Sequence, residues 1–180
     1  KFDEFAAGLG ALKLDDIAIT TNGQLIKRKA DALLGSAIRR ANISLDTLDP
    51  DAFSEIARGG DLATVCEGID LLRDAGWKLK VNMVPLRRAN ADQIVPMLEY
   101  CLDRNIELRY IELMNMGHLR SGNGFANDFF GMDDILSLIG EHVEYSRTDA
   151  PFDSTAVRYE VPGRGHFGII ANESAPFCSG

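Results

Sequence analysis

Residues 77–85 read Trp-Lys-Leu-Lys-Val-Asn-Met-Val-Pro (WKLKVNMVP), and this stretch decides the fold class. Its apolar side chains alternate with two lysines and an asparagine, which is the period-2 pattern of a β-strand with two unlike faces. The segments on both sides have helical periodicity, which indicates a parallel strand covered by helices. Parallel strands are usually apolar on both faces. A strand that directs Lys80 and Asn82 to the same side therefore predicts a polar space beside the sheet.

The rest of the chain alternates predicted strands with predicted helices. Strands are expected at residues 17–21, 41–45, 77–85 and 106–113, with amphipathic segments between them. Asp61 is the expected N-cap of one helix that ends at Gly76, and Pro50 is expected to begin a short one. Four strands joined by helical crossovers predict an α/β fold with a parallel sheet, open or curled into a barrel. A helix at residues 133–139 and an antiparallel hairpin at 156–161 and 166–170 should follow.

Polar side chains gather on one face of this predicted sheet, because residues two apart on a strand share a face. The set comprises Thr20, Asn42, Ser44, Lys80, Asn82 and Glu112, whereas Arg109 falls among the apolar side chains of the fourth strand. An unpaired polar group in an apolar interior costs about 1–3 kcal/mol, so the set predicts a polar cavity or barrel lumen. A structural role stays open for each residue, since strand-end turns use Thr20 and Asn22, and Lys80 can pair with Glu112 or Asp46.

Composition narrows the class of protein. The 180 residues are 46% apolar and carry a net charge of −8, which argues against a broad nucleic-acid-binding surface and leaves room for a small anion pocket. Neither a transmembrane run nor a signal peptide is evident, so a cytoplasmic location without membrane contact is expected. The three cysteines, Cys66, Cys101 and Cys178, do not make a disulfide framework and fit a reducing compartment.

Five motifs in order resemble one family. They are DDIAITTNGQL (15–25), ANISLDTLDPDAF (41–53), KVNMVPLRRAN (80–90), LRYIELM (108–114) and FGIIANESAPFC (167–178). Their order and spacing are similar to those of the MoaA family, the radical S-adenosylmethionine enzymes that cyclise GTP in molybdenum cofactor biosynthesis. The resemblance covers nearly all of the chain and matches a middle section of the family, so we expect an internal fragment.

The resemblance implies a partial radical SAM βα barrel in residues 1–125, with a helix and hairpin in residues 126–180 that lead into a truncated cluster-binding region. It implies two [4Fe–4S] clusters in the whole enzyme, one of which cleaves S-adenosylmethionine to start the cyclisation of GTP. Thr20 and Lys80 match GTP-contacting positions, and Ser44 and Met114 match positions that contact S-adenosylmethionine. Cys178 matches the first ligand of the second cluster.

The match also has gaps that bear on activity. The Cys-x-x-x-Cys-x-x-Cys motif, the glycine-rich second-strand motif and the cysteines expected after Cys178 are not in this sequence. An iron–sulfur cluster needs several thiolates, so the chain alone is expected to hold no cluster and to be inactive. The missing barrel half should leave a bare strand edge, which predicts self-association that sizing at several concentrations would detect.

Other functions remain open at this stage. A lysine on a barrel strand near a carboxylate is what a Schiff-base aldolase uses, with Lys80 as nucleophile and Glu112 or Asp46 as acid–base. The same scaffold serves radical SAM enzymes that modify other substrates. A non-catalytic fragment that retains a nucleotide pocket is a further alternative, and GTP calorimetry with Lys80→Ala separates these readings.

Overall fold

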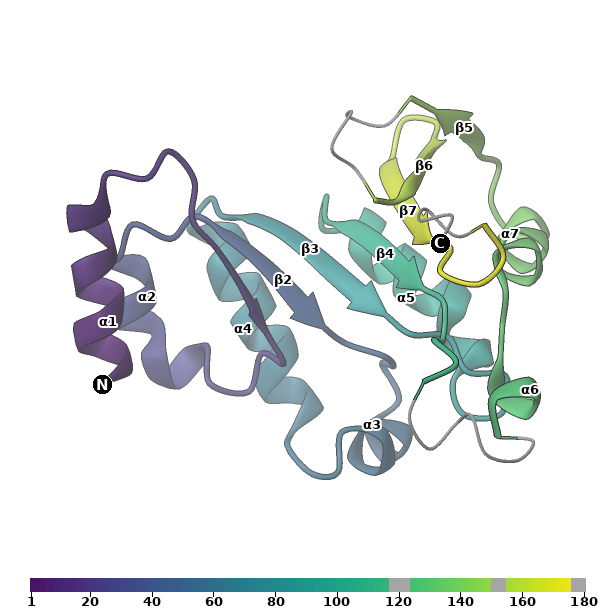
Figure 1. Ribbon diagram of the computed structural model, residues 1–180, viewed down its shortest axis with the longest axis horizontal. Helices are drawn as coiled ribbons and strands as arrows, with labels where there is room; N and C mark the ends of the chain where they lie inside the picture. Colours follow the sequence, from purple (N-terminus) through teal and green to yellow (C-terminus); the bar gives the residue numbers. More distant parts are fainter. Residues whose placement is uncertain (117–123, 150–154, 176–180) are drawn as a thin grey trace.

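The structure is a computed structural model that describes residues 1–116, 124–149 and 155–175. These residues form a seven-stranded sheet with the order β1-β2-β3-β4-β7-β6-β5. The strands are β1 (Ala18–Thr21), β2 (Arg40–Ser44), β3 (Lys78–Met83), β4 (Glu107–Ile111), β5 (Ser146–Thr148), β6 (Val157–Val161) and β7 (Gly165–Ile170). β1 to β4 and β7 are parallel, and β6 and β5 follow antiparallel (Figure 1). The predicted α/β class with a carboxyl-terminal hairpin is confirmed.

Short helices connect the strands. They are α1 (Phe2–Gly8), α2 (Ala30–Leu34), α3 (Pro50–Ile56), α4 (Leu62–Asp74), α5 (Ile94–Leu102), α6 (Gly124–Asp128) and α7 (Met132–Gly140), with 3₁₀ turns at Leu9–Leu12, Lys27–Lys29 and Ala91–Gln93. α4 begins as predicted, because the Asp61 carboxyl accepts the Thr64 N–H at 2.7 Å. It ends before Gly76, whose φ of +77° lies in the left-handed region that glycine adopts freely.

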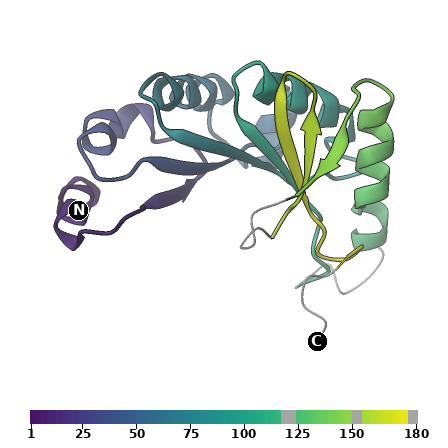
Figure 2. The ribbon, with the colours of Figure 1, turned by 90° about the horizontal axis from the view of Figure 1, so that it is seen from above.

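The sheet is curved, and α4 and α5 cover its convex face (Figure 2). The side chains that point toward the helices are buried, including Ile43, Val81, Met83, Leu108 and Tyr110. The alternating side chains of the same strands lie on the concave face, which is turned toward the viewer in Figure 1. Because one set packs on helices and the other lines an open hollow, the sheet has the form of a partial barrel wall.

The carboxyl-terminal hairpin shares the core of the parallel sheet. β7 pairs with β4 in parallel, and Phe167 on β7 is fully buried. Its ring stacks on Tyr159 with centroids 5.1 Å apart and meets Tyr110 of β4 edge-on at 6.2 Å. These aromatic contacts fasten β6 and β7 to the strands that precede them by more than forty residues.

Three local predictions differ from the structure. Helix α1 was not predicted, since Lys1 at its N-cap position offers no side-chain cap. Apolar residues recur at helical spacing over residues 25–37, which predicts a helix there, but the chain forms a 3₁₀ turn and the five-residue α2, which stops at Gly35. Asn90 with Gln93 resembles a helix-capping arrangement in the sequence, but the buried Asn90 side chain instead bonds the backbone of neighbouring loops. Within the described residues, no helix has the length and apolar character needed to cross a membrane.

Candidate functional site

The concave face carries two adjacent rows of polar side chains, which cross-strand register brings together. The first row comprises Thr20, Asn42, Lys80 and Glu107, which are paired in register across β1, β2, β3 and β4. The second row comprises Ser44, Asn82 and Arg109. It lies two residues nearer the carboxyl ends of the strands, a step of about 7 Å. Thr20 and Ser44 are exposed and the other five are half-buried, so the face is a shallow polar basin.

Arg109 is the organising cation of the second row. Its Nε donates to Asn82 Oδ1 at 3.0 Å, and its Nη2 donates to Asn42 Oδ1 at 2.9 Å. Partial burial lowers the pKa of the Arg109 guanidinium below its usual value. The expectation that Arg109 lies among the apolar side chains is therefore wrong, because the register of β4 turns Leu108 and Tyr110 toward the helices instead.

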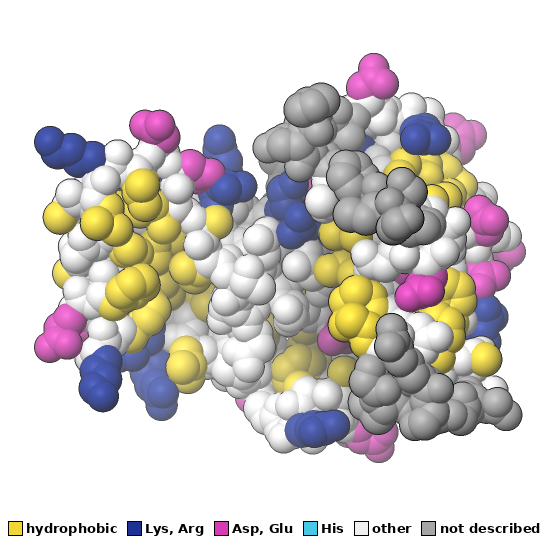
Figure 3. Space-filling view, viewed as in Figure 1, with side chains coloured by type: hydrophobic (Ala, Val, Ile, Leu, Met, Phe, Trp, Pro, Cys, Tyr) yellow, Lys and Arg dark blue, Asp and Glu magenta, His cyan; other side chains and the backbone are white. Residues whose placement is uncertain are grey.

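Lys80 has a partner that the sequence did not indicate. Its Nζ donates to Glu107 Oε1 at 2.7 Å, whereas Glu112 and Asp46, the expected partners, are engaged elsewhere. Two hollows flank Lys80 at the amino-terminal ends of the strands. One, of about 650 Å³, is lined by Asn42 and Arg40 among others, and the second, of about 320 Å³, by Glu107 of β4 and by residues of β6 and β7. Dark blue basic side chains gather over this end of the face in Figure 3.

Glu112 does not face the concave side, which corrects its place in the predicted polar set. It is 1% exposed and lies just after β4, on the same side as Tyr110. Its carboxyl accepts hydrogen bonds from the Met132 N–H at 2.8 Å, the Glu173 N–H at 2.8 Å, the Ser174 N–H at 2.9 Å and the Ser174 hydroxyl. Glu112 therefore joins the end of β4 to the start of α7 and to the segment after β7, and it is unavailable as an acid–base partner for Lys80.

Asp46 is likewise committed to the backbone at the carboxyl ends of the strands. Its carboxyl accepts the Val84 N–H at 2.8 Å, and burial raises its pKa above the usual value. Asn90, fully buried, donates to the Asp46 and Val84 carbonyl oxygens. Asp46 and Glu112 both bind the backbone. Neither can act as the acid–base group that a Schiff-base aldolase with Lys80 as nucleophile would need.

Comparison with known proteins places this geometry in a family. Residues 1–101 match the Radical SAM superfamily model, and residues 106–180 match the model described as Molybdenum Cofactor Synthesis C. The chain belongs to the radical SAM superfamily. The family resemblance found in the motifs is thereby confirmed, and the superfamily is defined by the use of S-adenosylmethionine with an iron–sulfur cluster.

Several relatives of this radical SAM chain are named GTP 3′,8-cyclase. A GTP 3′,8-cyclase of Listeria monocytogenes is 36% identical over 180 residues, which cover 97% of this chain and 54% of that protein. A GTP 3′,8-cyclase of Staphylococcus aureus is 38% identical over 172 residues, covering 92% of this chain and 49% of that one. The chain thus spans about half the length of the curated relatives it matches. The crystal structure of Streptococcus suis SuiB bound to S-adenosylmethionine superposes with a TM-score of 0.50 and 25% identity, covering 61% of this chain and 25% of SuiB.

The positions matched to cofactor contacts lie near the carboxyl ends of the radical SAM strands. Ser44 is the last residue of β2, with its hydroxyl exposed on the concave face. Met114 follows β4, is 42% exposed, and belongs to a segment whose next residue, Asn115, donates its N–H to the Glu173 carboxyl at 3.1 Å. The Ser44 hydroxyl can donate and accept hydrogen bonds at this end, and the Met114 thioether offers a soft, adaptable surface.

The cysteines of the described residues do not fit an iron–sulfur cluster. Cys66 on α4 and Cys101 on α5 belong to the helix layer on the convex side, and burial raises the pKa of the Cys101 thiol to about 12. Residues 1–116, 124–149 and 155–175 contain no group of three His, Cys, Asp or Glu side chains arranged around a metal position. Cys178, the expected cluster ligand, lies outside the described residues.

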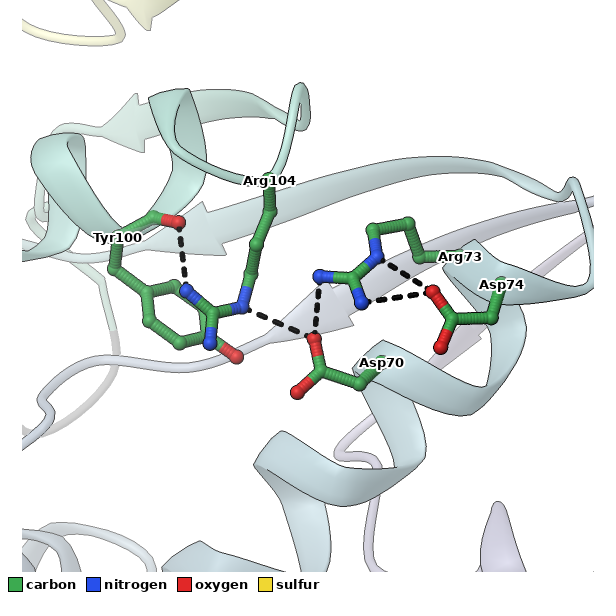
Figure 4. Close-up of polar contacts among 5 residues, drawn as sticks. All are labelled: Asp70, Arg73, Asp74, Tyr100 and Arg104. Carbon is green, nitrogen blue, oxygen red and sulfur yellow. Dashed lines mark hydrogen bonds and ion pairs between the residues drawn. The ribbon is translucent and has the colours of Figure 1, made fainter.

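The polar groups around Cys66 serve the helix layer. Arg104, in the turn just after α5, lies 3.9 Å above the centre of the Tyr100 ring and donates from Nε to Asp70 of α4 at 3.1 Å (Figure 4). Arg73 pairs with Asp70 at 2.7 Å and with Asp74 at 2.7 Å. This network fastens α4 to α5 on the side of the sheet opposite the polar rows, so it supports the wall rather than the site.

Proposed function

We propose that the whole protein is a GTP 3′,8-cyclase, a radical S-adenosylmethionine lyase that acts on GTP in molybdenum cofactor biosynthesis. The observation that carries the proposal is the pair of polar rows on the concave face. Thr20 and Lys80, matched to substrate contacts, share the first row, whereas Ser44 lies in the second row, nearer the carboxyl ends. This arrangement supports a substrate position and a cofactor position that are separated along the strands of one surface.

The residues of the first row fit an anionic nucleotide. The Lys80 ammonium is a point charge with three donors, and the Thr20 hydroxyl both donates and accepts. Arg109, held by two amide oxygens, adds a second cation whose planar guanidinium is already oriented. We assign these three residues to the binding of GTP, with Arg109 as an addition that the sequence pattern did not supply.

Ser44 of the second row and Met114 in the segment after β4 are assigned to S-adenosylmethionine. When bound, S-adenosylmethionine with its [4Fe–4S] cluster would supply the radical chemistry that the superfamily uses. Ser44 and Met114 would hold its polar and adenosyl parts beside the nucleotide. The proposal includes a second cluster with Cys178 as a ligand, and it places most cluster ligands in parts of the whole protein outside this chain.

The binding assignment is tested by calorimetry with GTP and the 180-residue chain. Replacing Lys80 with Ala is expected to weaken GTP binding at least about tenfold, because a charge-assisted hydrogen bond contributes about 1.5–3 kcal/mol. Lys27→Ala is the matched control, since Lys27 forms an ion pair with Glu67 of α4 on the helix side. Equal affinities for the two variants, or no heat with the unmodified chain, would contradict the assignment.

A second prediction concerns iron. After anaerobic reconstitution with iron and sulfide, the 180-residue chain is expected to carry no stoichiometric four-iron cluster, because Cys66 and Cys101 lie in the helix layer and one further thiolate is too few. Iron and sulfide analysis with visible absorption spectra gives the measurement. Four irons per chain, retained through gel filtration, would refute this prediction without bearing on GTP binding.

A further inference from the structure

The carboxyl of Glu107 bridges two cations from different strands in the hollow of about 320 Å³. Oε1 accepts from Lys80 Nζ of β3 at 2.7 Å, and Oε2 lies 3.8 Å from Arg158 Nη2 of β6. The three side chains are 38%, 31% and 21% exposed for Lys80, Arg158 and Glu107. The bridge is thus partly shielded from water. Attraction between charges is stronger in such a place than on an open surface.

The charge of this hollow is unbalanced. Lys78, Lys80, Arg158 and Arg164 line it, and Glu107 is the acidic residue among its described lining groups. Arg164 is already paired with Glu99 at 2.6 Å and Asp103 at 2.7 Å. One carboxylate therefore faces three remaining cations, which favours a ligand with more than one negative charge.

Arg158 also has unused hydrogen-bonding capacity. Its Nε is buried and has no partner among the described residues, and the same holds for the hydroxyl of Thr148, the residue opposite Arg158 on β5. Arg158 of β6 pairs in register with Gly168 of β7, and Gly168 pairs in register with Arg109 of β4. Gly168 places no side chain between the two arginines; an added Cβ would lie 3.1 Å from Ala156 Cβ and 3.6 Å from Arg109 Cγ.

We infer that Glu107 and Arg158 are specificity-determining residues for the polyphosphate part of the nucleotide. This inference rests on the proposed function and extends it to two residues that the motif match does not assign. In the structure the Glu107 carboxylate contacts both Lys80 and Arg158 and acts as their internal counter-ion. A triphosphate displaces this carboxylate and takes both cations, with Arg158 Nε as an additional donor.

Because Glu107 already neutralises part of the positive charge, a ligand must carry more negative charge than this carboxylate in order to displace it. A ligand with a single negative charge offers no more than the Glu107 carboxylate, which is already held in place by the strand and competes at high effective concentration. A triphosphate carries several charges and contacts both cations at once. A nucleoside monophosphate carries at most about two charges on one phosphate group, and a triphosphate carries more charge over a longer group that can contact both cations. The site therefore favours nucleoside triphosphates over monophosphates, and it does so through Glu107.

Two variants test the inference by moving affinity in opposite directions. With inorganic tripolyphosphate as the calorimetric probe at low salt, Glu107→Gln is expected to bind about tenfold more tightly because the competing charge is removed. Arg158→Gln is expected to bind tripolyphosphate about tenfold more weakly than the unmodified chain. Arg158→Lys is expected to have an affinity between those of Arg158→Gln and the unmodified chain. The matched controls, Glu67→Gln and Arg73→Gln on the helix side, are expected to bind as the unmodified chain does.

The controls for folding and function keep the outcomes separate. Circular dichroism and thermal melting establish that each variant is folded, and Glu107→Ser replaces Glu107→Gln should that variant melt early. Absence of tripolyphosphate binding to the unmodified chain, or a Glu107→Gln affinity that is unchanged or weaker, overturns the inference. GTP binding that depends on Lys80 but ignores Glu107 and Arg158 overturns it while the proposed function stands. A further outcome is that the Glu107 and Arg158 variants change tripolyphosphate affinity as expected, but GTP binds no more tightly than tripolyphosphate. That outcome supports the anion site and refutes its assignment to a nucleotide.

Discussion

Replacing Glu112 with Ala is expected to lower the free energy of unfolding by about 4 kcal/mol. Four donors converge on this carboxyl, and the side chain is 1% exposed. Truncation leaves the Met132, Glu173 and Ser174 N–H groups without their acceptor, and a lost hydrogen bond to a charged group costs about 1.5–3 kcal/mol. Urea unfolding followed by circular dichroism gives the change in free energy.

The effect of Glu112→Ala should also be local. Exchange of the Glu173 and Ser174 amide hydrogens is expected to accelerate more than exchange in β2 or β3, because these amides lose their acceptor directly. Glu112→Gln should cost less, since one carbonyl oxygen remains to accept. The control is Glu141→Ala, an exposed carboxyl at the end of α7, with an expected change within about 0.5 kcal/mol. A loss below about 1 kcal/mol for Glu112→Ala would show that water replaces the carboxyl at little cost.

Asn90→Ala is expected to cost about 3 kcal/mol for a related reason. The buried amide donates to the Asp46 carbonyl at 2.8 Å and the Val84 carbonyl at 3.1 Å, and its oxygen accepts the Leu86 N–H at 2.7 Å. Three backbone groups at the carboxyl ends of β2 and β3 lose their partner in a site with no access to water. The same urea measurement applies.

A second variant, Asn90→Asp, tests whether the two donor hydrogens of the amide are needed. Asn90→Asp keeps the shape but cannot donate when ionised, so it should be at least as destabilising as the alanine variant. Asn22→Ala is the control, because Asn22 is exposed and makes a single 3.3 Å bond to the Gln24 N–H. A stable Asn90→Asp variant would mean that the two carbonyl oxygens do not depend on this side chain.

The sequence predicted elements whose signals are local. The alternation in residues 79–83 located β3 and its two faces, and Asp61 with Gly76 gave the bounds of α4. It failed where the partner is distant. Glu112 looked like a cavity residue because its donors come from residues 132, 173 and 174, which no local pattern connects to it.

The candidate site shows the same division. Lys80 was expected on the polar face, and it lies there, because strand periodicity is a property of neighbouring residues. Its partner Glu107 depends on the register between β3 and β4, and the proximity of Arg158 depends on β7 inserting between β4 and β6. Arg109 was placed on the wrong face because the apolar Ile111 and Leu113 that follow it masked the alternation of β4.

The insertion of β7 beside β4 has a consequence for synthesis of the protein. β4 is complete at Ile111, but the strand that pairs with it begins at Gly165. Because the chain is synthesised in order, one edge of β4 stays unpaired while more than fifty further residues are translated. Ribosome-bound nascent chains that stop between the two strands should therefore be the ones that chaperones hold and proteases cut.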